Sequence, residues 1–516
     1  MPKPTTEISS SSVAFSGINS VDALLEGDKW GGALGTAPTI TYSFPNNNST
    51  FDTSIFTGYG PSGGDGEPWA AGYSGLNASQ KADAAQALSA WAEVADIDFV
   101  ASTDSANKVG TIRFAYSGAV GDAGAAAWAY LPISVPVGGD IWLSPSEATN
   151  DDLSPGGYGF ETLLHEIGHA LGLKHSFDNG GSGSVLPTAT DSIQYTVMAY
   201  NEHPNLDASA SSPLLYDIQA IQYLYGANDS TRSGDSTYTF GDGEHRAIWD
   251  AGGTDLFDLS NFTDGVTVEL TAGAFSSIGD DVFSGAAQDN IAIAYDVVIE
   301  NAIGGGGADF LRGNDVANSL FGGDGGDSLL GGNGSDSLLG GNGSDSLLGG
   351  NGDDFVQGNA GSDYSQGNAG NDTVRGGADG DTVRGGQGND FVKGDKGADL
   401  VQGDKGDDFV RGGKENDTVR GGQNSDTVFG DLGDDVLFGD KGDDTLYGGD
   451  GADLFVFRAG DGLDRIKDFD PAAGDLLEIR SGYASSEADG SVTLSLDDGG
   501  LVVLETISGF SDDWVV

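Results

Sequence analysis

The sequence contains no cysteine, which excludes disulfide bonds and metal sites built from thiolates. Basic residues are scarce: 22 Lys and Arg stand against 80 Asp and Glu, so the chain lacks the basic surface that nucleic-acid binding requires. It has no run of about 18 apolar residues, and its first residues lack the basic and apolar segments of a secretory signal peptide. We therefore expect no membrane insertion and no N-terminal export signal.

Acidic residues and glycine are present in excess. A net charge of −58 makes a compact chain repel itself unless bound cations neutralise part of that charge. The 87 glycines are concentrated in the second half of the sequence. At 516 residues the chain is long enough for two or three domains.

Three of the five histidines form the most informative motif. His165 and His169 are four residues apart and face one side of a helix, at a separation suited to one tetrahedral metal ion. Glu166 stands beside them, where a carboxylate can accept a proton from water. Gly172 lets the chain leave the helix with a positive φ, so that His175 can return as a third ligand. The pattern H-E-x-x-H-x-x-G-x-x-H is the metzincin zinc signature and predicts one catalytic zinc; a helix with solvated histidines is the alternative.

A methionine and a tyrosine follow this signature. Met198 is the only methionine besides the first residue, and metzincins place a methionine in a tight turn beneath the ligand histidines. Tyr200 is close enough in sequence for its phenol to reach the metal or an oxyanion beside it. Both residues also have an ordinary interpretation, Met198 as part of the core and Tyr200 as a partly buried structural residue.

Local patterns predict the other elements of the first half. Residues 1–20 are rich in Ser and Thr and predict a flexible leader or short propeptide. Helical spacing predicts helices over 77–95, with Asn77 as N-cap, over 160–171 and over 214–225. Strands are expected at 97–100, 111–115, 126–131 and 140–143.

The strand at 126–131 is expected at a sheet edge, because Pro132 and Pro136 interrupt the chain that follows it. An edge strand beside a zinc helix can pair with an extended peptide and hold it across the metal; an ordinary sheet edge is an equal alternative. The candidate substrate-binding residues are Ala127, Trp128, Ala129 and Tyr130.

From residue 304 to 456 the sequence repeats every nine residues as G-G-x-G-x-D-x-U-x, the pattern of a calcium-binding parallel β-roll. The glycines permit a tight turn whose carbonyls and aspartate coordinate a hard cation, and the short strand points one apolar side chain inward. Stacking and calcium supply the stability together, because one turn is too small to fold alone. A disordered tail does not explain so strict a period, although it suits the calcium-free state. The expected calcium ligands in the repeats are Asp309, Asp327, Asp336, Asp345, Asp354, Asp363, Asp372, Asp381, Asp390, Asp399, Asp408, Asp417, Asp426, Asp435, Asp444 and Asp453.

Several turns depart from this pattern. Asn318 replaces one aspartate, and Ser365 occupies an apolar position. The glycine positions are altered at Asn359, Asn368, Asp395, Asp404, Glu415 and Asn424. We expect weaker or absent calcium binding at these turns.

Together, the zinc signature, the methionine turn with Tyr200 and the nonapeptides resemble the serralysins, secreted metalloproteases of the metzincin clan. The resemblance continues through residues 213–222, 224–228, 249–255 and 299–304. It implies an α+β metzincin zinc-protease domain followed by an all-β parallel β-roll (RTX nonapeptide) domain with a C-terminal β cap. The implied segments are a leader (1–20), a catalytic domain (21–228), junction strands with a calcium site (229–303), the roll (304–456), and a cap with a secretion signal (457–516).

The resemblance also implies a role for each site residue. His165, His169 and His175 would bind zinc, Glu166 would be the general base, and Tyr200 would ligate zinc at rest and swing to the oxyanion. One zinc and several calcium ions are expected. The implied calcium ligands near the junction are Arg232, Gly234, Ser236, Asp250, Gly252, Asp255 and Glu300. Because the repeat array is longer than expected for the family, its middle portion is a candidate insertion with an added role.

Serralysins leave Gram-negative cells through a type I exporter that reads an uncleaved C-terminal signal, and this chain has a comparable acidic and then apolar stretch at residues 512–516. The resemblance therefore implies a secreted, extracellular monomer that meets protein substrates and the exporter; a protein inhibitor is a further candidate partner. Low cytosolic calcium would leave the array unfolded for export, and external calcium would fold it.

The sequence thus favours a secreted zinc endopeptidase joined to a calcium β-roll. The alternative is a non-catalytic extracellular calcium-dependent adhesin or surface-layer protein, which the long array supports and the intact metal ligands and base oppose. An astacin or a matrixin is disfavoured, because the chain lacks their disulfides or cysteine switch and those subfamilies lack the roll.

Overall fold

The structure is a computed structural model that describes residues 8–105, 108–281, 285–497, 499–505, 507 and 509–516. The chain divides into two units. Unit 1 consists of Met1–Ser236, Phe240–Gly253 and Ala272–Val298, and unit 2 consists of Thr237–Thr239, Thr254–Thr271 and Ile299–Val516. The expected junction segment, 229–303, is therefore shared between the two units. Among the described residues, no helix combines the length and the apolar character needed to cross a bilayer.

Unit 1 is built on a mostly parallel sheet with the strand order β5-β3-β6-β8-β7. The parallel strands are β3 (Thr39–Ser43), β5 (Asp98–Ala101), β6 (Ile112–Tyr116) and β8 (Asp140–Leu143). The short β4 (Ser74–Gly75) pairs with β6, and β7 (Ala127–Ala129) runs antiparallel to β8. β6 and β8 are buried along their whole length, so they form the centre of the core. β7 occupies the end of the strand order, and this confirms the predicted edge strand.

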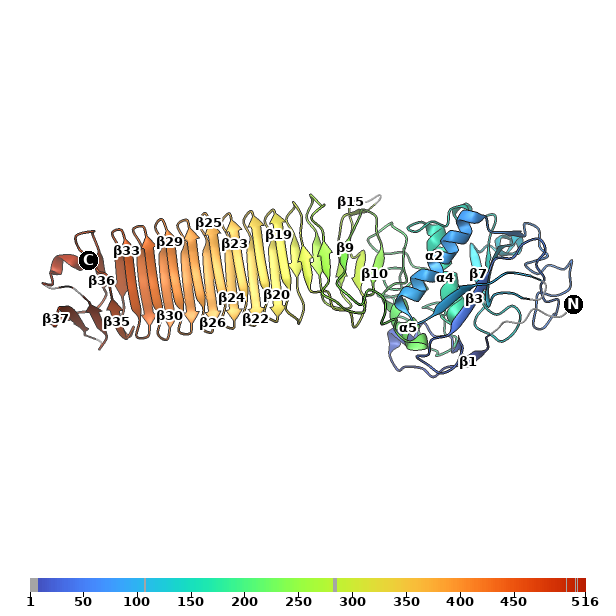
Figure 1. The fold of residues 1–516 in the computed structure, drawn as a ribbon, viewed down its shortest axis with the longest axis horizontal. Coiled ribbons are helices and arrows are strands. Elements are labelled where there is room, and N and C mark those ends of the chain that lie inside the picture. Colours follow the sequence, from blue (N-terminus) through green and yellow to red (C-terminus); the bar gives the residue numbers. More distant parts are fainter. Residues whose placement is uncertain (1–7, 106–107, 282–284, 498, 506, 508) are drawn as a thin grey trace. The chain divides into compact units, whose positions relative to one another are not determined.

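Three longer helices accompany this sheet: α2 (Ala78–Val94), α4 (Tyr158–Leu171) and α5 (Leu215–Tyr225). Figure 1 shows α2 and α4 next to each other, and α4 lies against β7. α2 begins at the predicted cap, because the Asn77 side chain accepts a hydrogen bond from the Gln80 N–H and the Gln80 side chain accepts one from the Asn77 N–H. Trp91 of α2 donates through Nε1 to the carbonyl of Leu164 on α4 at 3.3 Å. These contacts hold the metal-site helix against the core.

Part of the predicted flexible leader is folded. Residues 1–7 of that leader lie outside the described residues, but β1 (Ser10–Ser12) pairs antiparallel with β2 (Asp28–Trp30), and α1 (Asn19–Asp22) follows. The expectation of flexibility is therefore wrong for the Ser-rich strand. Its backbone groups provide the pairing, so the apolar alternation by which a strand is recognised in a sequence is missing.

The remaining short elements of unit 1 lie between and after these. They are α3 (Gly118–Asp122), the 3-10 turn η1 (Ala148–Asp151), β10 (Arg246–Ile248), β13 (Phe275–Ser276), β14 (Asp280–Asp281), β15 (Gly285–Ala286) and β16 (Ile291–Ile293).

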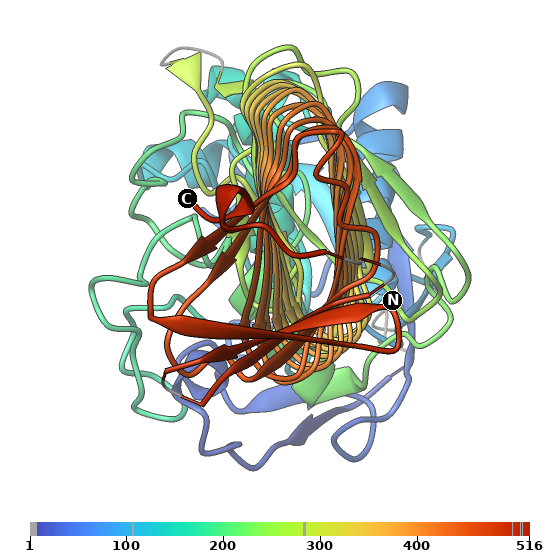
Figure 2. The same ribbon diagram turned by 90° about the vertical axis from the view of Figure 1, so that its left-hand side faces the viewer.

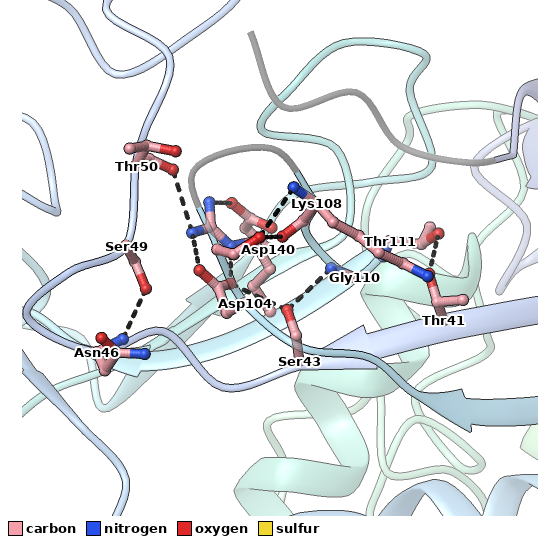
Figure 3. Close-up of polar contacts among 12 residues, drawn as sticks. Thr41, Ser43, Asn46, Ser49, Thr50, Asp104, Lys108, Gly110, Thr111 and Asp140 are labelled. Atoms are coloured by element: carbon pink, nitrogen blue, oxygen red, sulfur yellow. Dashed lines mark hydrogen bonds and ion pairs between the residues drawn. The ribbon is translucent and has the colours of Figure 1, made fainter. Parts of the chain in front are cut away.

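A buried ion cluster joins the central strands of unit 1 (Figure 3). Arg113 on β6 donates through Nε to Asp104 at 2.9 Å, and its NH1 lies 3.8 Å from Asp140 on β8. Asp104 also accepts from the hydroxyl of Ser43 on β3 at 3.0 Å. Tyr59 donates to Asp140, and burial raises the pKa of Asp140 to about 7. The cluster holds β3, β6 and β8 together and so supports the edge strand β7.

Unit 2 is a stack of short turns that forms two parallel sheets, visible side-on in Figure 1 and along the stack in Figure 2. Alternate turns contribute to alternate sheets, so paired residues are two repeats apart, as Leu329 and Leu347 are. The apolar residue of each repeat is buried between the sheets, which makes the core one side chain thick. The strands are β18 (Phe310–Arg312), β19 (Ser319–Asp324), β20 (Ser328–Asn333), β21 (Ser337–Asn342), β22 (Ser346–Asn351), β23 (Phe355–Ala360), β24 (Tyr364–Ala369), β25 (Thr373–Ala378), β26 (Thr382–Gln387), β27 (Phe391–Lys396), β28 (Leu400–Lys405), β29 (Phe409–Lys414), β30 (Thr418–Gln423), β31 (Thr427–Leu432), β32 (Val436–Lys441), β33 (Thr445–Asp450) and β34 (Leu454–Phe457).

The two sheets extend beyond the repeats at both ends. Before the repeats, the added strands are β9 (Thr237–Thr239), β11 (Leu256–Asp258), β12 (Thr267–Glu269) and β17 (Asn301–Ile303). After them come β35 (Leu463–Ile466), β36 (Leu476–Ile479), β37 (Tyr483–Ala488), β38 (Ser491–Leu496) and β39 (Leu501–Leu504), followed by η2 (Asp512–Trp514). β37, β38 and β39 are joined antiparallel and end the larger sheet, which gives the roll the expected C-terminal β cap.

Candidate metal centre

The three histidines of the signature converge in unit 1. One ring nitrogen from each of His165, His169 and His175 lies within 4.8 Å of the other two. α4 supplies the first two, and Gly172 ends that helix with φ 111°. A Cβ at position 172 would lie 2.3 Å from the carbonyl oxygen of Asp28, so both the backbone angle and the close approach require glycine. The chain then turns back through His175, as the spacing predicts.

The hydrogen bonds of the rings show that this cluster fits a cation. Nδ1 of His165 lies 2.6 Å from the carbonyl oxygen of Val197, and Nδ1 of His169 lies 2.8 Å from that of Leu173. A carbonyl only accepts, so each Nδ1 carries the proton and each Nε2 presents a lone pair. Nε2 of His169 and Nε2 of His175 are only 3.1 Å apart. Two facing lone pairs repel at that distance unless a cation lies between them, and a set of imidazole nitrogens suits zinc.

Burial favours the neutral rings that metal binding needs. It lowers the pKa of His165 to about 4 and lowers that of His169 well below the ordinary value, with the neighbouring histidines adding to both shifts. Both rings are therefore neutral near pH 7 without help from a metal, and the site does not have to release protons from them before binding an ion.

Glu166 and Tyr200 flank the histidines. Glu166 is 5% exposed, its Oε2 has no hydrogen-bond partner, and burial raises its pKa to about 8. The Tyr200 hydroxyl lies 2.9 Å from Nε2 of His175, and the residue is 66% exposed. A buried carboxyl group with a free oxygen and an exposed phenol thus line the same cleft as His165.

Met198 lies beneath the site, as the sequence predicts. It is fully buried, and a Cβ on Gly168 of α4 would lie 2.6 Å from its sulfur. Asp217 of α5 holds the methionine turn: its carboxylate accepts from the Thr196 hydroxyl at 2.5 Å and from the Val197 N–H at 2.8 Å. The turn, and with it the carbonyl that orients His165, is therefore tied to another helix.

Sequence reasoning missed three carboxylates of this region. Asp178 lies 3.1 Å from Nδ1 of His175 and orients the third ligand, and Asp217 anchors the methionine turn. Glu67 accepts from Trp128 Nε1 at 3.0 Å and from the Tyr130 hydroxyl at 2.5 Å. Only Asp178 had a local signal, three residues after the last histidine; the other two act on residues remote in sequence.

A cleft of about 420 Å³ opens beside His165 and Glu166. Ala127 of β7 lines it, together with the preceding residues 124–126. The other candidate substrate-binding residues lie differently, because Trp128 and Tyr130 direct their polar atoms to Glu67. Tyr130 N–H and the carbonyl of Ala126 bond toward β8, so by alternation Ala127 and Ala129 turn their backbone groups to the open edge.

The aspartates that recur every nine residues in the repeats of unit 2 form a second set of candidate metal ligands. Oδ1 of Asp345 accepts from the N–H of Asp327 at 2.8 Å, whereas its Oδ2 is buried without a hydrogen-bond partner. A Cβ on Gly340 would lie 2.3 Å from that Oδ2 and 2.7 Å from the carbonyl oxygen of Gly358. The glycine therefore leaves open a space lined by carboxylate and carbonyl oxygens, the donors that calcium prefers.

This arrangement recurs along the repeats of unit 2. Each aspartate expected as a calcium ligand in the repeats, from Asp327 to Asp453, has a buried Oδ2 without a hydrogen-bond partner. Burial raises the pKa of Asp381, Asp417 and Asp426 to about 8, as expected for carboxylates that lack a counter-charge. The row of free oxygens fits a row of hard cations.

The first two of these repeat positions, Asp309 and Asn318, differ from the others. Both oxygens of Asp309 accept backbone N–H groups, from Val266 at 2.9 Å and from Gly305 at 2.7 Å. Asn318, which replaces the aspartate of its repeat, accepts a hydrogen bond from the Asn314 N–H and donates one to the carbonyl of Glu300. Asp309 therefore offers less support for a calcium site than the aspartates that follow it.

The predicted junction ligands fall into both units. In unit 1, Asp250 accepts from the Gly252 N–H at 2.8 Å, and the Ser236 hydroxyl donates to the carbonyl of Gly234 at 3.1 Å. Arg232 of the same unit has a φ of 49°. In unit 2, Glu300 accepts from the Asp255 N–H at 2.7 Å. Within each unit these residues form ordered loops, and their calcium role remains a prediction.

Comparisons with known proteins agree with this geometry. The family model described as Peptidase M10 serralysin C terminal matches residues 217–480, just over half of the chain, and the model described as Matrixin matches residues 74–226. The matrixin match concerns the catalytic part alone, where the missing cysteine switch had disfavoured that subfamily.

Three curated relatives illustrate the similarity. A serralysin of Photorhabdus laumondii subsp. laumondii is 40% identical over 285 residues, which cover 50% of this chain and 58% of the relative. Metallopeptidase AprA of Pseudomonas marginalis is 38% identical over 283 residues (48% and 57%), and a serralysin of Proteus mirabilis is 36% identical over 332 residues (57% and 64%). The chain thus spans less than two thirds of the length of each of these relatives.

Proposed function

This chain belongs to the serralysin-type metallopeptidases of family M10, and from that premise we propose that it is a secreted zinc-dependent endopeptidase acting on proteins. The observation that carries the proposal is the convergence of three imidazole lone pairs beside a buried carboxylate with an unpaired oxygen. A non-catalytic adhesin would have no use for that constellation.

His165, His169 and His175 would hold one zinc ion, with the Tyr200 hydroxyl near enough to complete the set in the resting enzyme. Bound zinc would supply Lewis acidity, which polarises the scissile carbonyl and makes water easier to deprotonate. The Nδ1 contacts of the three histidines keep their rings oriented throughout.

Glu166 is the general base in this proposal. Its unpaired Oε2 accepts a proton from the attacking water and then passes that proton to the leaving amine. Burial in a site without another partner for Oε2 keeps this oxygen available for the proton in both steps. Tyr200 donates from its phenol to the oxyanion of the substrate, for which its exposed position leaves room.

The edge strand β7 would hold the substrate. Ala127 and Ala129 offer outward backbone N–H and carbonyl groups, and an extended peptide can add to a sheet edge through such groups. Their small side chains also leave a peptide room to approach. β7 would therefore bind the substrate through backbone hydrogen bonds. The side chains of Trp128 and Tyr130 would keep the strand in place through their hydrogen bonds to Glu67.

Calcium would complete the roll, and the roll would serve folding and export. The buried oxygens from Asp327 to Asp453 require counter-charges, which millimolar calcium outside the cell supplies and the cytosol does not. We place the protein outside the cell by a type I exporter that reads its C-terminal part; a protein inhibitor is a further candidate partner, and a monomer is the expected state.

The experiment compares wild type with Glu166→Gln and Glu166→Ala on a protein substrate, after zinc loading and zinc analysis. We expect one zinc per chain in all three proteins and a loss of about 10² to 10⁴ in kcat in both variants. Glu93→Gln, an exposed change of the same chemistry on α2, should keep full activity. A folded, zinc-loaded wild type without hydrolytic activity would overturn the proposal and favour the adhesin alternative.

A further inference from the structure

The cleft beside the metal centre is acidic, and the following inference deepens the proposed function and rests on it. Glu161, Glu166 and Glu202 line this cleft of about 420 Å³, together with His165 and Tyr200. Glu161 stands on α4 one turn before His165 and is 7% exposed, whereas Glu202 is exposed. One deeply placed carboxylate and one at the surface thus belong to the same cavity.

These carboxylates lack basic partners. Among the described residues, no Lys or Arg lines the cleft, and no ion pair with Glu161, Glu166 or Glu202 is formed. Oε2 of Glu161 accepts from the Ala210 N–H at 2.7 Å, which fixes the side chain without neutralising it. Burial, opposed by that hydrogen bond and reinforced by Glu202, raises the pKa of Glu161 to about 7. A cation bound beside Glu161 would favour its ionised form, and no basic side chain among the described residues already fills that role.

Tyr158 also lies among acidic residues. It lines the cleft at the start of α4, and after burial the nearby charges that raise its pKa are Glu161, Glu147, Glu166 and Glu202. All four are carboxylates, and no cation offsets them. Tyr158 is thus surrounded by carboxyl groups, with no basic residue among the charges that shift its pKa.

Two further observations point to a ligand. Oε2 of Glu166 is buried, lacks a hydrogen-bond partner and borders the cleft. Gly124 and the alanines 125–127 also line the cleft, and their small side chains leave room for a long one. Ile193 and Val197 add apolar surface on which an aliphatic stem can lie.

We propose that this cleft binds the Lys or Arg side chain of a substrate residue next to the scissile bond, and that Glu161 and Glu202 determine this specificity. The aliphatic stem packs on the small and apolar wall while the charged head reaches the two carboxylates. A substrate Glu at the same position meets like charges in a partly buried site and is rejected. An uncharged Leu neither gains nor loses this interaction.

The test uses zinc-loaded full-length protein and fluorogenic peptides that differ only in having Lys, Leu or Glu at one position, scanned through both sides of the cleaved bond. We expect one position at which kcat/KM for Lys exceeds that for Leu by about tenfold, with Glu below both. Glu161→Gln keeps an acceptor for the Ala210 N–H, and Glu202→Gln changes an exposed residue; each should lower the Lys preference and leave the Leu peptide within about twofold. Glu93→Gln is the matched control and should keep the wild-type preference.

Several outcomes overturn the inference. Cleavage of all peptides without a charge preference, or a Lys preference that survives in the Glu161→Gln/Glu202→Gln double variant, removes it while leaving the proposed function intact. A zinc-loaded wild type that cleaves none of the peptides and no protein overturns both. If Glu161→Gln fails to fold, Glu202→Gln alone decides, because its side chain carries no part of the core.

Discussion

Each histidine of the proposed zinc site has an oxygen acceptor beside its Nδ1, and these acceptors are of two kinds. Backbone carbonyls of Val197 and Leu173 hold His165 and His169, whereas the half-exposed carboxylate of Asp178 holds His175. A carbonyl cannot release its partner without moving the backbone, but a carboxylate side chain can rotate. His175 is therefore the ligand with the most freedom, and it is also the one that Tyr200 contacts.

Ser365 is a defect in the core of the roll. Its side chain is fully buried at a position that Leu or Val occupies in neighbouring turns, and its hydroxyl has no hydrogen-bond partner. Ser365→Val should raise the free energy of unfolding of the calcium-loaded protein by about 1–3 kcal/mol, because it removes a buried unpaired hydroxyl and adds apolar contacts. Urea unfolding measures the change. Ser362→Val, at an exposed position of the same turn, should leave stability nearly unchanged, and equal effects of the two variants would contradict the prediction.

Asp140 should make the free energy of unfolding of unit 1 depend on pH. Its pKa is raised by burial to about 7 in the folded chain, against about 3.9 when unfolded, so the folded state favours the protonated carboxyl. The stabilising contribution is complete below about pH 4 and is lost as the pH rises through about 7. Relative to Asp140→Asn, whose amide does not titrate, wild type should lose stability between about pH 5 and about pH 8, at no more than about 1.4 kcal/mol per pH unit.

Denaturant unfolding of wild type and Asp140→Asn at the two pH values measures this difference. Asp96→Asn removes an exposed carboxylate from unit 1 and should follow wild type at both pH values. An unchanged pH slope in Asp140→Asn would show that the carboxyl is ionised in the folded protein at neutral pH.

At the scale of elements, β7 is held from one side by β8 and from beneath by Glu67. Trp128 and Tyr130 point the same way because they are two residues apart in a strand, and both donate to this one buried carboxylate. The strand that would carry the substrate thus owes its position to a loop some sixty residues earlier.

Glu67→Leu tests this arrangement. It leaves two donors without an acceptor, at a cost of about 1–3 kcal/mol each, and frees β7 to shift. If β7 holds the substrate, KM should rise about tenfold with a smaller change in kcat, since the zinc ligands stay in place. Glu67→Gln keeps one acceptor oxygen and should stay close to wild type. A purely structural role would lower stability and kcat without this selective rise in KM.

The altered turns of the roll keep the backbone of the regular ones. Asp404 and Asp431 stand where the repeat has glycine, yet they keep positive φ values of 79° and 79°, which Asp tolerates better than most residues. Their carboxylates pair with Arg384 and Arg411 on the neighbouring strands of the same sheets. Because these pairs are partly exposed, they add little to the stability of the turns, which depends mainly on packing between the sheets.

At the scale of the molecule, charge and folding are coupled. The whole chain carries a net charge of −58, and unit 2 contains a row of buried, unpartnered carboxylate oxygens, so we expect folding of unit 2 to require cations. Calcium removal by a chelator should therefore abolish the β-sheet circular dichroism of the array, and millimolar calcium should restore it. Magnesium should not, since it demands a smaller, near-octahedral site. A metal-free protein that keeps its β-sheet signal would contradict the calcium assignment.

The sequence by itself determined the parts of this protein that depend on local spacing. Two histidines four residues apart meet on any α-helix, a nine-residue period stacks in one way, and Asn77 with Gln80 caps a helix wherever that helix forms. These predictions agree with the structure because their cause lies within a few residues.

Only the tertiary structure decided what joins distant residues. It paired the Ser-rich β1 with β2, set Asp217 beneath the methionine turn, brought Glu67 to β7, and gathered Glu161 and Glu202 around one cleft. It also assigned both oxygens of Asp309 to backbone N–H groups, although its repeat resembles the others. Contacts of this kind leave no periodic trace, because a single carboxylate can accept from any donor that the packing of the whole chain places beside it.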